Sequence, residues 1–233
     1  MNIAEKLQAI AENEQKVYEA GKQAEHDKFW ANFFSNIGTN GSQAFSGPGW
    51  KDNTFLPDRD IAFAVWTHTF AMGFRVTESL TDWLGKLGVK LDFSKTSDSG
   101  LVETFYQTGQ KDVGTLDLSV LPYEKIGTPF AYAVSTTTAH LILKSDGSQT
   151  FGGENAFRAT NLTNLTFEGV IGNNVTFRYC EKLSNESVQN IIDHLLTITD
   201  GVARTITFHA NVKAKLTDEQ IATITTEKGW TLA

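Results

Sequence analysis

Phenylalanines recur along this chain at a nearly constant interval, and this period constrains the fold more than any other feature. Six of them follow at steps of 25, 35, 25, 27 and 20 residues: Phe45, Phe70, Phe105, Phe130, Phe157 and Phe177. Short apolar triplets run between them at steps of 25, 25, 24 and 41 residues: Leu91-Asp92-Phe93, Leu116-Asp117-Leu118, Leu141-Ile142-Leu143, Leu165-Thr166-Phe167 and Ile206-Thr207-Phe208. Two interlocked series with one period predict a stack of similar coils, because each coil buries its apolar face only against its neighbours.

The predicted fold class is therefore an α+β repeat. It consists of a solenoid of about 5–6 irregular coils with short parallel strands, an N-terminal helix and C-terminal helices. The domain organisation is a helix over residues 1–35 followed by a solenoid over 36–233, whose closing cap begins at about residue 184. We expect Phe105, Phe130 and Phe157 to form a column inside the stack.

The N-terminal helix has a thin apolar stripe. Its apolar residues recur at three- and four-residue steps or multiples of them: Ile3, Leu7, Ile10, Val17, Ala24 and Ala31. An isolated helix of this kind is marginal in water. It is expected to pair with copies of itself as a stalk, giving a homo-oligomer through residues 1–35, or to dock on the first coil. The docking residues would be Phe29, Trp30, Phe33 and Phe34.

Helical insertions explain the two longest steps. After Phe70, a short helix is predicted with Thr77 as its N-cap and Gly88 at its end, and its apolar residues are Leu80, Trp83, Leu84 and Leu87. After Phe177, Ser184 suits the N-cap of a helix whose apolar stripe is Val188, Ile191, Ile192, Leu195 and Leu196. Thr217 and Gln220 predict a capping box for a last short helix, and residues 230–232 predict a last strand.

Composition excludes several classes of protein. The formal net charge of −7 disfavours nucleic acid as a partner, because its phosphates would repel the chain. The one cysteine excludes an internal disulfide. The start of the chain has no uninterrupted apolar signal region, and no apolar run reaches about 18 residues, so neither a signal peptide nor membrane insertion is predicted. We expect synthesis in the cytoplasm without export by the ordinary secretory route.

Catalytic and metal-binding patterns are missing from the sequence. The five histidines, His26, His68, His140, His194 and His209, share no spacing that is typical of metal ligands. Cys180 is expected to be a buried, inert thiol, because no basic neighbour in the sequence would lower its pKa. We therefore predict no catalytic residues, no metal and no cofactor.

Asp92 and Asp117 form the most informative acidic pair. Each occupies the middle of its triplet, so stacked strands would place both side chains on the same outward face. A carbohydrate-active β-solenoid would carry its acids there. The equivalent later positions are Ile142, Thr166 and Thr207, which favours a solvent-facing surface instead. The predicted binding residues are Asp92, Asp117, Thr166 and Thr207 on the strand face, and Tyr106, Tyr132 and Tyr179 as exposed aromatics. The alternative for the tyrosines is half-buried packing between coils.

Two segments resemble a known family. Residues 153–172, with Ala156-Phe157, Leu162, Leu165 and Phe167, resemble the BspA-like leucine-rich repeat, and residues 182–233 are similar to the closing segment of such repeats. The first 30 residues look like the start of phage and prophage structural proteins of Gram-positive gut bacteria. The resemblance implies a leucine-rich-repeat-like solenoid with one short-stranded sheet on one side, and it implies binding without catalysis.

Three functions stay open on these grounds. The first is a non-enzymatic repeat protein that mediates protein–protein or host-surface binding, as a tail or fibre accessory part of a phage or prophage particle, and hence virion-associated. The second is a bacterial leucine-rich-repeat adhesin or scaffold. The third is a carbohydrate-active β-solenoid, which depends on Asp92 and Asp117 alone.

Overall fold

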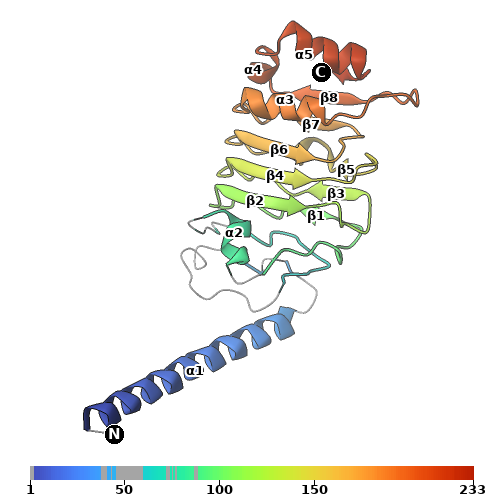
Figure 1. Ribbon diagram of the computed structural model, residues 1–233. Helices are drawn as coiled ribbons and strands as arrows, with labels where there is room; N and C mark the ends of the chain where they lie inside the picture. Colours follow the sequence, from blue (N-terminus) through green and yellow to red (C-terminus); the bar gives the residue numbers. More distant parts are fainter. Residues whose placement is uncertain are drawn as a thin grey trace.

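Short parallel strands stack above one another to form the body of the protein in the computed structural model (Figure 1). The structure describes residues 3–37, 41–42, 44–45, 60–71, 74, 76, 78–86 and 89–233. The first sheet has the order β1-β3-β5, with β1 at Leu101–Val102, β3 at Lys125–Thr128 and β5 at Thr150–Phe151. The second has the order β2-β4-β6, with β2 at Asp112–Asp117, β4 at Thr138–Ile142 and β6 at Asn164–Glu168. The third has the order β7-β8-β9, with β7 at Val175–Phe177, β8 at Thr205–Phe208 and β9 at Thr231–Leu232.

The predicted fold class is wrong. Within the described residues, the chain is an α/β fold with three separate three-stranded parallel sheets and five α-helices, not an α+β leucine-rich-repeat-like solenoid. Such a solenoid would collect every triplet in one sheet, but only the three middle triplets share β2-β4-β6. Leu91 pairs with Ile61 instead, and Ile206 belongs to the third sheet.

A column of phenylalanine rings fills the interior, as predicted. Consecutive rings from Phe45 through Phe70, Phe105 and Phe130 to Phe157 stack with centroids 5.3, 5.7, 5.4 and 5.9 Å apart. Every one of these rings is at most 1% exposed. Parallel rings at this separation gain stacking energy in addition to their burial. The column therefore links segments that are 25 to 35 residues apart in sequence.

The helices begin where local capping signals place them. α2 spans Leu80–Gly85 and α3 spans Asn185–Asp193, and their N-caps are Ser79 and Ser184, whose hydroxyls accept backbone N–H groups. The prediction of Thr77 as the N-cap of α2 is wrong, and Thr77, Leu87 and Gly88 lie outside the described residues. The predicted capping box of Thr217 and Gln220 is confirmed at the start of α5.

The remaining helices lie at the two ends of the chain. α1 spans Ile3–Ile37, α4 Ala210–Lys213 and α5 Asp218–Ala222, and a short π-helical turn follows at Thr223–Glu227. A 3-10 turn lies at Gly153–Asn155. Figure 1 shows α1 leading away from the sheets, whereas α4 and α5 cover their C-terminal end. No described helix is both long and apolar enough to cross a membrane.

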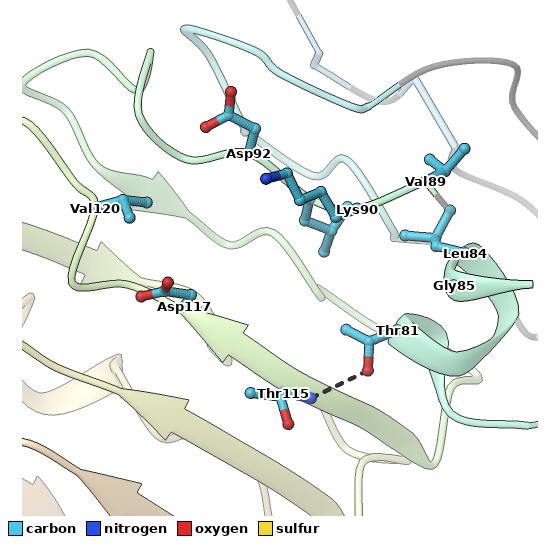
Figure 2. Close-up of a pocket in the computed structure, with 10 residues that line it drawn as sticks. Thr81, Leu84, Gly85, Val89, Lys90, Asp92, Thr115, Asp117 and Val120 are labelled. Atoms are coloured by element: carbon cyan, nitrogen blue, oxygen red, sulfur yellow. Dashed lines mark hydrogen bonds between the residues drawn. The ribbon is translucent and has the colours of Figure 1, made fainter. Parts of the chain in front are cut away.

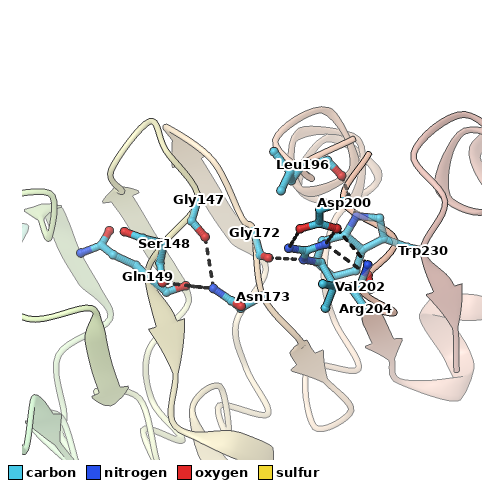
Figure 3. Close-up of polar contacts among 10 residues, drawn as sticks. All are labelled: Gly147, Ser148, Gln149, Gly172, Asn173, Leu196, Asp200, Val202, Arg204 and Trp230. Atoms are coloured by element: carbon cyan, nitrogen blue, oxygen red, sulfur yellow. Dashed lines mark hydrogen bonds and ion pairs between the residues drawn. The ribbon is translucent and has the colours of Figure 1, made fainter. Parts of the chain in front are cut away.

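Polar side chains connect the loops along one edge of the stack (Figure 3). Asn173 Nδ2 donates to the carbonyl oxygens of residues 147–149, each at 3.1 Å. Arg204 Nε donates to the Gly172 carbonyl at 2.5 Å, and its guanidinium forms an ion pair with Asp200 at 2.7 Å. These contacts satisfy loop carbonyls that the short strands leave unpaired. Asn173 and Arg204 therefore fix the positions of the loops along this edge of the stack.

Candidate functional site

The outward face of β2-β4-β6 carries rows of polar side chains. Buried and outward residues alternate along β4 and β6 and over the last residues of β2, so Leu116, Leu141 and Phe167 point into the core. The register places three outward rows across the three strands: Thr115–His140–Thr166, Asp117–Ile142–Glu168 and Asp112–Thr138–Asn164.

His140 is the central side chain of the first row. Its Nδ1 lies 2.7 Å from Thr166 Oγ1 and its Nε2 lies 3.2 Å from Glu168 Oε1. These contacts hold the imidazole across two strands and fix its plane on the face. His140 is not among the predicted binding residues, although its place between the apolar residues Ala139 and Leu141 indicates an outward strand position.

A polar hollow of about 260 Å³ lies between the start of α2 and this face. Hydroxyl, amide and carboxylate groups line it, including those of Thr81, Asp82, Asp112, Thr138, Asn164 and Thr166. Thr81 Oγ1 accepts a hydrogen bond from the Thr115 backbone N–H at 3.1 Å, which docks α2 against the edge of β2.

A second hollow of about 300 Å³ adjoins the first, and Thr81 and Thr115 line both (Figure 2). We call this second hollow the groove. Its apolar wall consists of Leu84, Val89, Leu91 and Val120. Its polar rim consists of Lys90, Asp92 and Asp117. A concave apolar surface with a few polar groups at its rim is typical of a binding site.

The groove exists because the strand ladder is interrupted. The backbone on either side of Leu91 bonds to Ile61: the Ile61 N–H donates to the Lys90 carbonyl at 2.9 Å, and the Asp92 N–H donates to the Ile61 carbonyl at 2.8 Å. Within the described part of the chain, β2 pairs with β4 on one side and with no strand on the other, so it forms an edge of its sheet. The space between Leu91 and β2 stays open.

Asp92 and Asp117 line the same groove, from its two opposite sides. Asp92 Oδ1 accepts from the Ser94 N–H at 2.9 Å, and Asp117 Oδ1 accepts from the Ser119 N–H at 3.1 Å. The hydrogen bonds from the Ser94 hydroxyl and then from its N–H lower the pKa of Asp92. Asp92 is therefore ionised at neutral pH and does not have the raised pKa that a general acid needs.

The structure corrects the predicted row of acids and threonines. Ile142 pairs with Glu168, and Thr166 pairs with His140, because the step from β4 to β6 is 26 residues in the observed register instead of 24. Thr207 lies in β8, opposite Thr176, and thus in a different sheet. α3 takes the place beside β6 that another strand would occupy, so the chain contributes its next strands to the third sheet.

The three predicted tyrosines are half-buried; Tyr106 packs against Tyr132, and Arg158 contacts both Tyr132 and Tyr179. The rings of Tyr106 and Tyr132 are 5.4 Å apart, and the Arg158 guanidinium lies 4.0 Å from the Tyr132 ring and 5.0 Å from the Tyr179 ring. Arg158 also donates to the Tyr132 hydroxyl at 2.7 Å. Neither the groove nor the polar hollow is lined by any of these tyrosines. The packing interpretation describes them better than the binding one.

The remaining candidate groups do not join this site. Cys180 is fully buried, as predicted, and burial raises the pKa of its thiol to about 12, which disfavours the reactive thiolate. Among the described residues, no three His, Cys, Asp or Glu side chains come together as metal ligands. Lys90 and Val120 line the groove but are not among the predicted binding residues, because no local pattern marks them and only the fold brings them to it.

Comparison of the chain with family models, with curated proteins and with solved structures finds no match in any of the three. The resemblance to BspA-like repeats and to phage structural proteins therefore stays a prediction from the sequence segments alone.

Proposed function

We propose that the chain is a non-enzymatic binding protein, and that its binding site is the groove together with the adjoining outward face of β2-β4-β6. The observation that carries this proposal is the open space of about 300 Å³ between Leu91 and the edge of β2, which pairs with no further strand among the described residues. Buried backbone edges are normally paired or covered. The apolar wall of the groove is open and lies beside rows of polar side chains. Such a surface can bind the surface of a partner.

The hydrogen bonds of the two acidic residues give each of them a structural role in a turn. Asp92 and Asp117 each use one carboxylate oxygen to hold the turn that follows its strand segment. A glycosidase needs one protonated and one ionised carboxyl on either side of its substrate. The lowered pKa of Asp92 does not suit the protonated role.

The proposed setting is a phage or prophage particle, in which the chain binds another structural protein or the host surface. Its support is the resemblance of the first 30 residues and of the repeat segments to such proteins. Antibodies against the chain should label purified tail particles in this setting. Labelling confined to the cytoplasm of the host would count against it.

We propose in addition that α1 pairs with α1 of other copies. The described side chains from Glu12 to Glu25 are all exposed, including Val17 at 65% and Tyr18 at 56%. Most of the stability of helices in proteins comes from packing of an apolar face against a neighbour. Light scattering should give a smaller oligomer for a truncation that lacks residues 1–28 than for the full chain. Equal masses for the two would contradict the pairing.

A matched pair of valines tests the binding site. Val120, on the groove wall, is 42% exposed, and Val134, which lines neither hollow, is 43% exposed. Val120→Arg should fill the groove and abolish binding of the labelled protein to host cells or to a glycan array, whereas Val134→Arg should bind as the unmodified chain does. Equal binding by both variants would refute the proposed site.

A further inference from the structure

Among the described residues, the charged groups around the groove are mostly acidic. The side chains that line the groove and the polar hollow include four carboxylates, those of Asp82, Asp92, Asp112 and Asp117, and one ammonium group, that of Lys90. Among the described residues, no phenylalanine, tyrosine or tryptophan lines either hollow. Carbohydrate sites commonly stack sugar rings on aromatic side chains, and an acidic ligand would be repelled here. The charge therefore favours a cationic group.

Asp117 is the carboxylate best placed to receive that group. It is exposed, and its Oδ1 holds the Ser119 N–H and hydroxyl, whereas no ion pair joins it to a lysine or arginine within the described part of the chain. Lys90 does not neutralise Asp117, because its ammonium group is directed to the Asp92 side of the groove (Figure 2). The second oxygen of Asp117 is thus available to a donor from outside.

The wall beside Asp117 suits an aliphatic stem. Val120 and Leu91 present apolar surface to the groove, and Val120 is 42% exposed. Lysine and arginine bury their methylene stems along such surfaces while the charged head reaches a polar partner. Arginine can in addition bind a carboxylate with two parallel hydrogen bonds.

We infer that the groove receives a lysine or arginine side chain from a protein partner, with its stem on Leu91 and Val120 and its charged head on Asp117. This inference rests on the proposed function and names the partner chemistry for that site. It selects a basic segment of a protein rather than a glycan or an acidic surface.

Short peptides test the inference on the full chain. The probes are three seven-residue peptides that differ only at a central arginine, lysine or citrulline, the last being an uncharged analogue of arginine. The arginine and lysine peptides, at millimolar concentration, should shift the amide NMR signals of Thr115, Asp117 and Val120, and the citrulline peptide should not. The shifts should weaken as salt is raised, because exposed charges are screened.

A pair of carboxylates supplies the matched control. Asp117→Asn keeps an oxygen for the Ser119 N–H and removes the charge. It should therefore lower the affinity for the arginine peptide about tenfold, as expected for loss of a hydrogen bond between charged groups. Asp146 accepts from the Ser148 N–H at 2.9 Å in a similar turn and does not line the groove. Asp146→Asn should leave the affinity unchanged.

The results separate this inference from the proposed function. Equal binding of the arginine and citrulline peptides, equal effects of the two Asn variants, or no shift with the arginine peptide would each overturn the inference. If Val120→Arg still abolishes cell or glycan binding in that case, the proposed site stands with another ligand. If Val120→Arg has no effect on that binding, the proposed function fails independently.

Discussion

The two edges of β2-β4-β6 are covered by helices in different ways. At the β6 edge, Ser187 Oγ accepts from the Leu165 N–H at 2.9 Å, and Asn190 Oδ1 accepts from the Phe167 N–H at 2.7 Å. At the β2 edge, the side-chain cap is the hydrogen bond from the Thr115 N–H to Thr81 Oγ1 at 3.1 Å. α3 therefore replaces a strand along β6, whereas α2 covers only part of β2.

This difference suggests two roles: the β6 edge contributes to stability, and the β2 edge is the one that can bind a partner. α3 contributes Val188, Ile191 and Ile192 to the core, and its polar side chains satisfy the strand backbone. α2 spans six residues, and the groove opens beside it. An edge that is fully paired cannot admit a partner, whereas a partly covered edge can. The experiments below test whether the two edges are as unequal as their contacts indicate.

The largest effect is expected from core truncation in α3. Ile192 is fully buried, so Ile192→Ala should lower the free energy of unfolding by about 2–5 kcal/mol. Leu84→Ala in α2 should cost less, because the space it leaves joins the open groove instead of forming a closed cavity. Urea denaturation of both variants measures the difference. A larger loss for Leu84→Ala would mean that the β2 edge is the better packed one.

Gly114 controls how closely α2 approaches β2. Its φ is +70°, and an added Cβ would collide with Thr81 Oγ1. Gly114→Ala should cost about 1–2 kcal/mol for the left-handed backbone, in addition to the loss of the Thr81 contact. Thermal unfolding measures the loss of stability, and the Thr115 amide should exchange faster with solvent. Unchanged exchange at Thr115 would show that the Thr81 hydrogen bond does not hold this edge.

Removing one capping side chain at each edge compares them directly. Asn190→Ala leaves the Phe167 N–H without its partner in a partly buried place, which should cost about 1–3 kcal/mol. Thr81→Val leaves the exposed Thr115 N–H to water and should cost less than about 1 kcal/mol. Chemical denaturation of the two variants at one pH gives both values. Equal costs would remove the distinction between a closed edge and an open one.

The sequence signals predicted the caps and the phenylalanine column but not the pairing of the strands. The caps at Ser184 and Thr217 depend on local patterns, whereas the column follows from the repeat of the phenylalanines, and all three appear in the structure. The choice of Ile61 as the partner of Leu91 joins residues that are 30 positions apart in the sequence. That choice is a long-range one, and periodicity alone does not determine it.

The candidate site was predictable to the same extent. Asp92, Asp117 and Thr166 were selected because they alternate with buried residues, and they do line the groove and the adjoining hollow. Thr207 was selected on the same pattern and lies in another sheet. Alternation assigns a side chain to a face of its strand, but it does not assign the strand to a sheet.

The smallest expected effect concerns the charge of Asp92 at the polar rim of the groove. The largest cause of its lowered pKa is the Ser94 hydroxyl, whereas for Asp146 it is the backbone N–H of Ser148. Ser94→Ala should therefore raise the pKa of Asp92 toward its ordinary value of 3.8, and Ser148→Ala should change the pKa of Asp146 less. NMR titration of the side-chain carboxyl signals measures both changes.

The sign of the pH dependence follows from the direction of the Asp92 shift. Because the pKa of Asp92 is lower in the folded chain than the ordinary value of 3.8, its hydrogen bonds contribute stability that is fully present above about pH 4. That contribution is lost as the pH falls through the lowered pKa. The stability difference between the unmodified chain and Ser94→Ala should therefore shrink on acidification. A difference that grows as the pH falls would contradict the assignment of the Ser94 hydroxyl as a donor to an ionised Asp92, and with it the anionic rim of the groove.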